Sequence, residues 1–302
     1  MKTYHNPVLL KECIEGLNIN PNGIYVDVTF GGGGHSREIL SKLTAGKLIA
    51  FDQDEDALKN TIEDERFNLI NENFRYLKNF LRYYGAIPVD GILADLGVSS
   101  YQIDNAEKGF STRNEGPLDM RMSKNTAMSA KEIVNEYDEI QLKETFKLYG
   151  ELNNAGKIAQ EIVKVRKTQT IETTTQLMSA LKTFAPRGKE NKFFAQLFQA
   201  LRIQVNNELE SLQELLKQSI EVLKPGGRLV VISYHSLEDR IVKNFMRSGN
   251  LAGYIEKDFY GNNLSPINQV GKLIIPEDKE IEQNSRARSA KLRIAEKINI
   301  ND

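Results

Sequence analysis

The sequence contains little cysteine, no long apolar run and almost no net charge, and each absence excludes a class of protein. Its one cysteine, Cys13, excludes an internal disulfide framework, and no group of cysteines and histidines has the spacing of a zinc site. No uninterrupted apolar run approaches the roughly 20 residues that cross a bilayer, and the polar N-terminus lacks the core of a signal peptide. We therefore expect a soluble, cytoplasmic protein without a metal, in which Cys13 is a packing residue.

The net charge of -1 argues against a protein that coats nucleic acid through bulk charge. Positive charge nevertheless gathers in two runs. Residues 164–192 hold seven lysines and arginines against two glutamates, and residues 285–295 hold four against no acidic residue. Such runs suit phosphate groups, and an ordinary solvated basic face is the alternative. The cations are Lys164, Arg166, Lys167, Lys182, Arg187, Lys189 and Lys192, then Arg286, Arg288, Lys291 and Arg293.

Strands and helices alternate along the first third of the sequence. Short apolar runs predict strands, and the stretches between them predict helices, a spacing typical of βαβ units in a parallel sheet. The predicted strands cover residues 24–30, 47–51, 67–70 and 90–94, and the predicted helices residues 36–43, 55–63 and 75–84.

The alternation stops near residue 105, and no comparable strand occurs before about residue 195. Apolar residues at spacings of three and four then predict one amphipathic helix from Leu201 to Leu223. The other predicted segments are helices at 130–136, 140–148 and 155–165, a strand at 228–234, a helix from Ser236, and apolar runs at 272–275 and 290–295.

This pattern indicates an α/β domain formed by residues 1–104 and 196–302, interrupted by a mainly helical insert at residues 105–195. An insert after the fourth strand lies at the carboxyl ends of the strands, where open α/β sheets bind ligands. It is therefore well placed to hold a substrate.

Four consecutive glycines, at residues 31–34, follow the first strand. Glycines allow a tight turn where a Cβ would block a ligand, and Asp52 ends the next strand, where an acidic residue can accept hydrogen bonds from ribose. A dinucleotide fingerprint fails, because its third glycine would fall on Ser36 or Arg37. A broader glycine loop with an acidic ribose partner is typical of enzymes that use S-adenosylmethionine. The alternative is a βα turn without a ligand.

Asp95 ends the fourth strand, so its carboxylate should emerge at the same edge of the sheet. Methylation of an exocyclic base amine requires the nitrogen lone pair, which is delocalised into the ring, to face the methyl donor. A carboxylate that accepts the amine N–H groups would orient the nitrogen and could take the departing proton. The alternative is that Asp95 or Ser99 caps the next helix.

Two further residues have open roles. His235 follows the fifth strand and either contacts substrate or is a hydrogen-bonded structural residue. Phe74, just after the third strand, either packs on an adenine ring or belongs to the core. Ser236, with Asp239 three residues later, predicts a capping box at the start of a helix. A serine hydrolase is excluded, since no Gly-x-Ser-x-Gly elbow occurs.

Eight blocks of the sequence match one known pattern. In chain order they are His5-Asn6-Pro7-Val8-Leu9-Leu10, Asp27-Val28-Thr29-Phe30-Gly31 with Gly33-Gly34-His35-Ser36, Asp95-Leu96-Gly97-Val98-Ser99-Ser100-x-Gln102, Gly109-Phe110-Ser111, Gly116-Pro117-Leu118-Asp119-Met120-Arg121-Met122, Phe198-Gln199-Ala200-Leu201-Arg202, His235-Ser236-Leu237-Glu238-Asp239-Arg240 and Ser285-Arg286-Ala287-Arg288-Ser289. Together they resemble the ribosomal RNA small-subunit methyltransferase H family.

The resemblance implies a class I, Rossmann-like methyltransferase that uses S-adenosylmethionine and holds RNA with its helical insert. It implies methylation of the exocyclic N4 of a cytidine in the decoding region of 16S ribosomal RNA, with either the RNA or the small ribosomal subunit as substrate. Asp95 is the catalytic residue that it implies, and His235 is a second candidate. The implied cofactor residues are Gly33, Gly34, His35, Asp52, Phe74, Asp95 and Gln102.

Three residues depart from the family pattern: Lys108 replaces the usual Arg, Tyr101 a frequent Pro, and Tyr234 a common Phe. Lys108 matters most, since lysine cannot make the bidentate phosphate contact of arginine. The Asp95 motif also contains no aromatic residue, so another residue has to stack on the target base. Tyr101, Phe110 and Tyr234 are the alternatives.

Two other functional classes remain for comparison. A nicotinamide-dependent oxidoreductase is disfavoured by the incomplete dinucleotide fingerprint. A non-catalytic RNA-binding or ribosome-assembly factor is disfavoured because Gly33, Gly34, Asp52 and Asp95 are all intact.

Overall fold

A computed structural model describes residues 7–299, and the chain divides into two compact units. Unit 1 combines Met1–Gly97 with Leu209–Asp302, and unit 2 is Val98–Glu208. Unit 2 therefore extends beyond the expected insert, residues 105–195, at both ends. His5 and Asn6, which begin the first sequence block, lie outside the described residues.

The second boundary lies at a break between two helices. The apolar spacing predicts one helix from Leu201 to Leu223, and this prediction is wrong, because α9 (Glu190–Asn206) and α10 (Glu208–Val222) are separate. Asn207 between them has φ 48, the left-handed conformation that ends many helices. The periodicity continues because each helix buries an apolar face, α9 in the core of unit 2 and α10 in that of unit 1.

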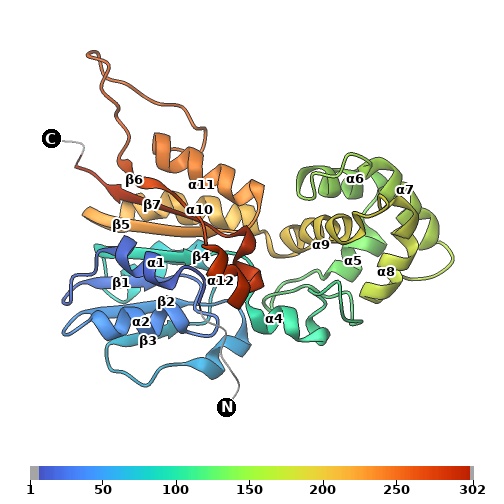
Figure 1. Cartoon of the computed structure of the whole chain (residues 1–302), viewed down its shortest axis with the longest axis horizontal. Helices are drawn as coiled ribbons and strands as arrows, with labels where there is room; N and C mark the ends of the chain where they lie inside the picture. The colour runs from blue at the N-terminus through green and yellow to red at the C-terminus, as the bar shows by residue number, and fades with distance from the viewer. Residues whose placement is uncertain (1–6, 300–302) are drawn as a thin grey trace. The chain divides into compact units, whose positions relative to one another are not determined.

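Within the described residues, unit 1 is built on one seven-stranded sheet of order β3-β2-β1-β4-β5-β7-β6 (Figure 1). The first five strands are parallel, β7 is antiparallel to β5, and β6 is antiparallel to β7. The predicted Rossmann-like α/β fold is confirmed. The strands are β1 (Ile24–Asp27), β2 (Lys47–Phe51), β3 (Phe67–Ile70), β4 (Val89–Asp95), β5 (Leu223–Ser233), β6 (Ile267–Ile274) and β7 (Lys291–Lys297).

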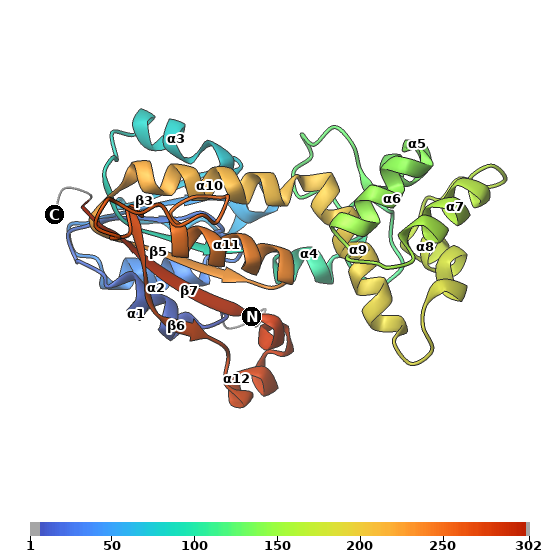
Figure 2. The same cartoon turned by 90° about the horizontal axis from the view of Figure 1, so that it is seen from above.

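Helices cover both faces of this sheet (Figure 2). One face packs on α1 (Leu10–Leu17) and α2 (Gly34–Lys42), and Cys13 is buried there as the sequence predicts. The other face packs on α3 (Leu77–Tyr83), α10 and α11 (Ser236–Ser248). Over residues 7–299, no helix is both long and apolar enough to cross a membrane.

Two predicted helices of unit 1 are shorter than expected. Residues 55–63 contain only the 3-10 helix η1 (Glu55–Asn60), which buries Ala57 alone and so has no apolar face to support a longer helix. Residues 75–84 divide between η2 (Phe74–Tyr76) and α3. The remaining short elements near the C-terminus are α12 (Asp278–Gln283) and η5 (Ser285–Ser289).

Unit 2 is helical, as predicted for the insert, and its helices enclose a separate apolar core. The helices predicted at 130–136 and 155–165 are confirmed as α5 and α7. The elements are α4 (Ser100–Asp104), η3 (Ala106–Lys108), α5 (Ala130–Glu136), α6 (Glu139–Leu148), α7 (Ala155–Val165), α8 (Thr174–Leu181), η4 (Lys182–Phe184) and α9.

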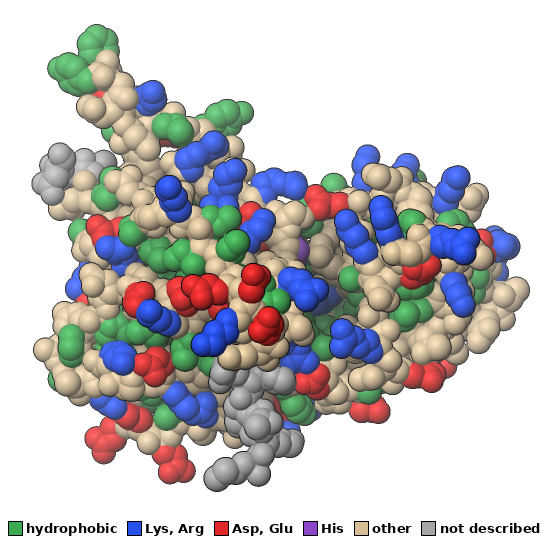
Figure 3. All heavy atoms as spheres, viewed as in Figure 1, with side chains coloured by type: hydrophobic (Ala, Val, Ile, Leu, Met, Phe, Trp, Pro, Cys, Tyr) green, Lys and Arg blue, Asp and Glu red, His purple; other side chains and the backbone are tan. Residues whose placement is uncertain are grey.

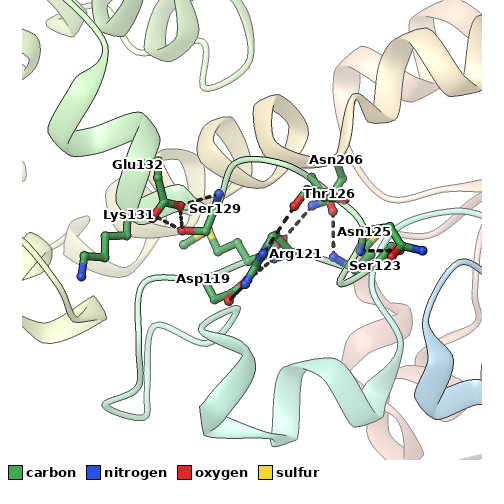
Figure 4. A network of polar contacts seen from close by, with 11 residues as sticks. Asp119, Arg121, Ser123, Asn125, Thr126, Ser129, Lys131, Glu132 and Asn206 are labelled. Carbon is green, nitrogen blue, oxygen red and sulfur yellow. Dashed lines mark hydrogen bonds and ion pairs between the residues drawn. The ribbon is translucent and has the colours of Figure 1, made fainter.

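The Gly116 to Met122 block forms a fixed loop in unit 2 (Figure 4). Arg121 donates to both carboxylate oxygens of Asp119, at 2.9 Å from Nε and 2.8 Å from Nη2. Asn206 of α9 accepts the N–H of Met122 and donates to the carbonyl of Met120, each at 2.8 Å. Met120 is fully buried with φ 61, so these bonds hold a residue in a conformation that non-glycine residues rarely adopt.

Candidate active site

Three acidic residues follow neighbouring strands of unit 1. Asp27 ends β1, Asp95 ends β4, and Asp52 comes directly after β2. Because β2 and β4 flank β1, the carboxyl ends of the three strands meet at one edge. The strand order reverses between β1 and β4, and open α/β sheets bind ligands at such a switch point. The structure therefore brings Asp52 and Asp95 to the edge that the sequence predicts.

The glycine turn connects β1 to α2. Gly33 is the N-cap of α2, with φ 75, and the first backbone N–H groups of a helix have no partner within it. A Cβ on Gly33 would lie 2.8 Å from Phe30 Cζ, and one on Gly34 would lie 2.3 Å from Pro7 Cγ. The expectation that these glycines keep the space open for a ligand is thus incomplete, because the nearest obstacles are atoms of the protein itself.

Asp52 closes the glycine turn. Its Oδ2 accepts the N–H of Gly31 at 2.7 Å, and its Oδ1 accepts that of Asp54 at 2.8 Å. Desolvation of this half-buried carboxyl raises its pKa to about 6, although the two hydrogen bonds oppose the shift. The carboxylate is held in one orientation and keeps lone pairs that can accept hydroxyl groups.

Asp27 is buried and holds the turn together. It accepts the hydroxyl of Ser36 at 2.6 Å and the N–H of Thr29 at 3.1 Å. The hydroxyl oxygen of Thr29 in turn accepts the N–H of Asp95 at 2.7 Å, which links the ends of β1 and β4. Desolvation raises the pKa of Asp27, while His35 and the Ser36 hydroxyl oppose that shift. Asp27 therefore has a structural role at the edge.

Asp95 has partners of a different kind. The Tyr234 hydroxyl donates to Asp95 Oδ1 at 2.7 Å, and His35 Nδ1 lies 3.8 Å from Asp95 Oδ2. The Asp95 side chain remains 24% exposed, so a ligand can reach it. Desolvation raises the pKa of Asp95; His35 and the Tyr234 hydrogen bond lower it, and the charges of Asp27 and Glu238 raise it further. The carboxylate is fixed, accessible and more basic than an ordinary aspartate.

The ring of His35 lies between the backbone of Val8 and the carboxylate of Asp95. The His35 side chain is buried, and Nε2 lies 3.0 Å from the carbonyl oxygen of Val8. A carbonyl only accepts, so we assign a proton to Nε2, and Nδ1 faces Asp95. A cofactor contact by His35 would therefore use its backbone N–H in the first turn of α2.

His235 is the N-cap of α11. Its Nδ1 accepts the N–H of Glu238 at 3.4 Å, and Ser236 is already helical, so the prediction that Ser236 caps the helix is wrong. An imidazole nitrogen here takes the place of the usual side-chain oxygen. His235 Nε2 lies 3.2 Å from Glu238 Oε1 but has no hydrogen-bond partner within residues 7–299. A contact between His235 and substrate stays a prediction.

Two expected cofactor residues have structural contacts. Phe74 begins η2 and packs partly buried against the core of unit 1. Gln102 belongs to unit 2, where its side-chain oxygen accepts the N–H of Ser99 at 2.9 Å in a capping box. That box also shows that Ser99, not Asp95, caps the helix after β4. The cofactor roles of Phe74 and Gln102 stay predictions.

The three departures from the family pattern acquire physical explanations. Lys108 Nζ lies 5.7 Å above the ring of Tyr101, so two of the departing residues contact each other within unit 2. Tyr234 supplies the hydroxyl that holds Asp95. Among the three candidates for base stacking, Phe110 is buried in the core of unit 2, whereas Tyr101 is 46% exposed.

Sequence reasoning missed Thr29, Ser36 and the hydroxyl of Tyr234 as members of this hydrogen-bond network. The signal for Tyr234 was the strand register: Asp95 of β4 pairs with Ile232 of β5, so Tyr234 follows directly beyond the same edge. Thr29 and Ser36 could be found only once the path of the glycine turn was known.

Known proteins resemble the chain over nearly its full length. A model of the MraW methylase family matches residues 2–298. A ribosomal RNA small subunit methyltransferase H of Christiangramia forsetii is 61% identical over 98% of this chain and 98% of its own length. Its namesake in Flavobacterium johnsoniae is 59% identical over 98% of each chain, and that in Cytophaga hutchinsonii 58% identical over 97% and 99%. The chain therefore belongs to the MraW methylase family and is an S-adenosylmethionine-dependent methyltransferase.

Proposed function

We propose that this enzyme methylates the exocyclic N4 of a cytidine in the decoding region of 16S ribosomal RNA. The observation that carries the proposal is Asp95, an accessible carboxylate at the switch point of the sheet, fixed by Tyr234 and with a raised pKa. The relatives' names, which specify the small-subunit ribosomal RNA, support the substrate class.

The residues of this chain favour an amine over a ring carbon as methyl acceptor. Methylation at C5 of cytosine needs a nucleophile, usually a thiolate, to attack the neighbouring carbon first. The only cysteine, Cys13, is fully buried in the core beside α2, and desolvation and nearby acids raise its thiol pKa well above the ordinary value. It cannot serve as that nucleophile, whereas an amine needs only orientation and loss of a proton.

The edge of the sheet fits the methyl donor. S-adenosylmethionine supplies a methyl group on a positively charged sulfur, which is already a good leaving group. The carboxylate of Asp52 would accept the ribose hydroxyls, and the N–H groups of Gly34 and His35 at the start of α2 would bind the methionine carboxylate. No carboxylate at this edge is tied to a lysine or arginine in the described residues, which suits a cationic ligand.

Asp95 would then orient the amine. Oδ1 is held by Tyr234, so Oδ2 is the oxygen that accepts an N–H of the cytidine amine. Accepting this bond localises the nitrogen lone pair and points it away from the ring plane, toward the methyl donor. After transfer, the surplus proton of the amine moves to Oδ2 of Asp95, whose side chain is 24% exposed.

Unit 2 supplies cations for the RNA, but fewer than the sequence suggests. Of the basic run, Lys164 pairs with Glu161, and Arg166 donates to the carbonyls of Val134 and Tyr137. The cations that are exposed and make no ion pair within residues 7–299 are Lys167, Lys182, Arg187, Lys189 and Lys192. Figure 3 shows lysine and arginine side chains across the displayed face of this unit. These five suit phosphate contacts.

Two of the four cations near the C-terminus pair within unit 1. Lys291 and Arg293 both donate to Asp239 of α11, at 3.0 Å and 2.8 Å. This pairing links β7 to α11, so these two cations stabilise unit 1, and Lys291 remains 40% exposed.

The test is to identify the modified nucleoside. Small ribosomal subunits from cells that lack this protein are incubated with the enzyme and labelled cofactor, and the digested RNA is analysed by mass spectrometry. N4-methylcytidine within the decoding region is the expected product. Label in 5-methylcytidine, in another region, or in the large-subunit RNA would contradict the proposal.

A further inference from the structure

A long loop of unit 1 carries three exposed aromatic rings. The loop, residues 249–266, connects α11 to β6 and projects away from both (Figure 1). Phe259 is 98% exposed, Tyr260 86% and Tyr254 75%. A group of large exposed apolar side chains marks an interaction site. These rings belong neither to the sheet edge that carries Asp52 and Asp95 nor to the basic run of unit 2.

The backbone of the loop tip is fixed by a polar turn. Asp258 accepts the N–H groups of Tyr260 and Asn262, each at 2.8 Å, and Lys257 forms a β-bridge with Asn263. The rings of Phe259 and Tyr260 stand edge to face with centroids 5.8 Å apart. Since the backbone is already ordered, a partner that binds these rings loses little conformational entropy in the loop.

Cations lie on α11, where the loop begins, and within the loop itself. Lys243 and Arg247, four residues apart on one face of α11, are both exposed, and Lys257 is exposed within the loop. Arg247 donates to the carbonyl of Gly253 at 3.2 Å, which ties this face of α11 to the loop. Figure 3 shows hydrophobic side chains at the end of the loop and lysine and arginine side chains below it. Within residues 249–266 the carboxylates are Glu256 and Asp258, and Asp258 accepts the N–H groups of its own turn.

We propose that the aromatic loop surface, formed by Tyr254, Phe259, Tyr260, Lys243 and Arg247, binds an unpaired stretch of the substrate RNA away from the methylated nucleotide. The proposal rests on the proposed function, since it assigns part of the substrate to this surface. Uncovered aromatic rings stack on any base, while neighbouring cations bind the phosphates.

Two other partners fit the chemistry less well. A base-paired stem presents its phosphates and sugars while its bases are stacked inside, so it would leave Phe259 and Tyr260 without a partner. An apolar pocket on a protein would take the rings but would leave Lys243 and Arg247 unpaired. Unpaired RNA is the partner that uses both kinds of side chain.

The test compares substrate binding with turnover. The double variant Phe259→Ala/Tyr260→Ala should raise the KM for unmethylated small subunits about 30-fold or more, because two stacking contacts are lost, with kcat and cofactor affinity unchanged. The variant Phe259→Tyr/Tyr260→Phe keeps both rings and should restore the parent KM. Lys243→Ala/Arg247→Ala should also raise KM and reduce the dependence of binding on salt by about two ionic contacts.

Tyr83→Ala is the matched control, since this ring on α3 is 82% exposed and lies outside the surface. It should leave KM unchanged. A parent-like KM for Phe259→Ala/Tyr260→Ala would overturn the proposal. If this variant also has a lower oligomeric mass than the parent, the rings contact a second copy of the protein instead of RNA. If the parent enzyme methylates no cytidine N4, the proposed function fails, and filter binding of the same variants to single-stranded RNA still tests the surface.

Discussion

The pKa values of carboxylates at the sheet edge of unit 1 and of carboxylates in unit 2 are shifted in opposite directions. Desolvation raises the pKa of Asp27, Asp52 and Asp95 at the edge, where backbone N–H groups and hydroxyls are the hydrogen-bond partners. In unit 2, desolvation also raises the pKa of Asp119, but the hydrogen bonds from Arg121 outweigh it, and a hydrogen bond from Lys131 lowers the pKa of Glu172.

This difference separates the carboxylates that serve the reaction from those that stabilise the fold. A carboxylate with a nearby cation is stabilised as an anion, so it is a weaker base and a weaker hydrogen-bond acceptor for a ligand. A desolvated carboxylate without a lysine or arginine partner is a stronger base and a better acceptor, at a cost in stability that functional sites commonly bear. On this view, replacing an edge carboxylate should affect reaction or cofactor binding, and replacing one in unit 2 should affect folding.

Asp95→Asn should have the largest effect. Asparagine keeps an oxygen for Tyr234 but loses the negative charge and basicity, so kcat should fall by about 100- to 10,000-fold, the usual contribution of a catalytic base. Single-turnover methylation of small subunits at saturating cofactor measures this, and calorimetry measures the cofactor affinity separately. Asp95→Asn enzyme that is folded, binds cofactor and methylates at the parent rate would remove Asp95 from the mechanism.

Asp52→Ala should have the second-largest effect, a loss of affinity for the cofactor. Loss of the charged acceptor should raise the Kd for S-adenosylmethionine about 10- to 100-fold. The parent should also lose affinity as pH falls through about 6, because Asp52 is ionised above that pKa and protonated below it. Titration calorimetry on both proteins checks this, and the affinity of Asp52→Ala should be nearly independent of pH in the same range. An equal pH dependence in both proteins would assign it to another group.

Tyr234→Phe should have a smaller effect that depends on pH. The Tyr234 hydrogen bond lowers the pKa of Asp95, so its removal should raise that pKa and shift the acid limb of the kcat profile to higher pH. At neutral pH we expect kcat about three- to tenfold lower, as for one lost hydrogen bond. Because Phe is common here in the family that the sequence resembles, the fold should tolerate the change. A pH profile that superimposes on that of the parent would show that Tyr234 does not influence Asp95.

The sequence predicted which strand ends form this site better than it predicted the hydrogen bonds within the site. Asp52 and Asp95 could be placed because each ends a strand, and parallel strands end at a common edge. Tyr234, Thr29 and Ser36 could not, because their partners depend on the path of the glycine turn and on the β4–β5 register. Asp27 was visible only as part of a sequence block.

The errors about helices have a similar cause. One apolar period runs from Leu201 to Leu223, so nothing in it revealed that Asn207 separates two helices in two cores. His235 was not recognised as a cap, since caps are normally found by searching for side-chain oxygens. The run of basic residues at 164–192 suits phosphates or a solvated face, yet Arg166 donates to two backbone carbonyls inside unit 2, a contact that charge patterning cannot predict.

Asp119→Asn should leave kcat unchanged and lower the unfolding free energy of unit 2. Asparagine cannot form the paired ionic hydrogen bonds with Arg121 that hold buried Met120 at φ 61, so we expect a loss of about 1 to 3 kcal/mol in unfolding free energy. Thermal unfolding measures this, and kcat per folded molecule should match the parent.

Asp64→Asn provides a matched control for that prediction. Asp64 and Arg66 in unit 1 repeat the same spacing and the same contacts, with Nε 2.9 Å from Oδ1 and Nη2 2.5 Å from Oδ2. The residue between them, Glu65, is exposed and has no left-handed backbone to maintain. Asp64→Asn should therefore change the melting temperature less than Asp119→Asn. Equal losses would mean that the ion pair itself, and not the conformation it imposes on Met120, accounts for the stability. A fall in kcat for Asp119→Asn would contradict the assignment of catalysis to the carboxylates of the sheet edge and of stability to those of unit 2.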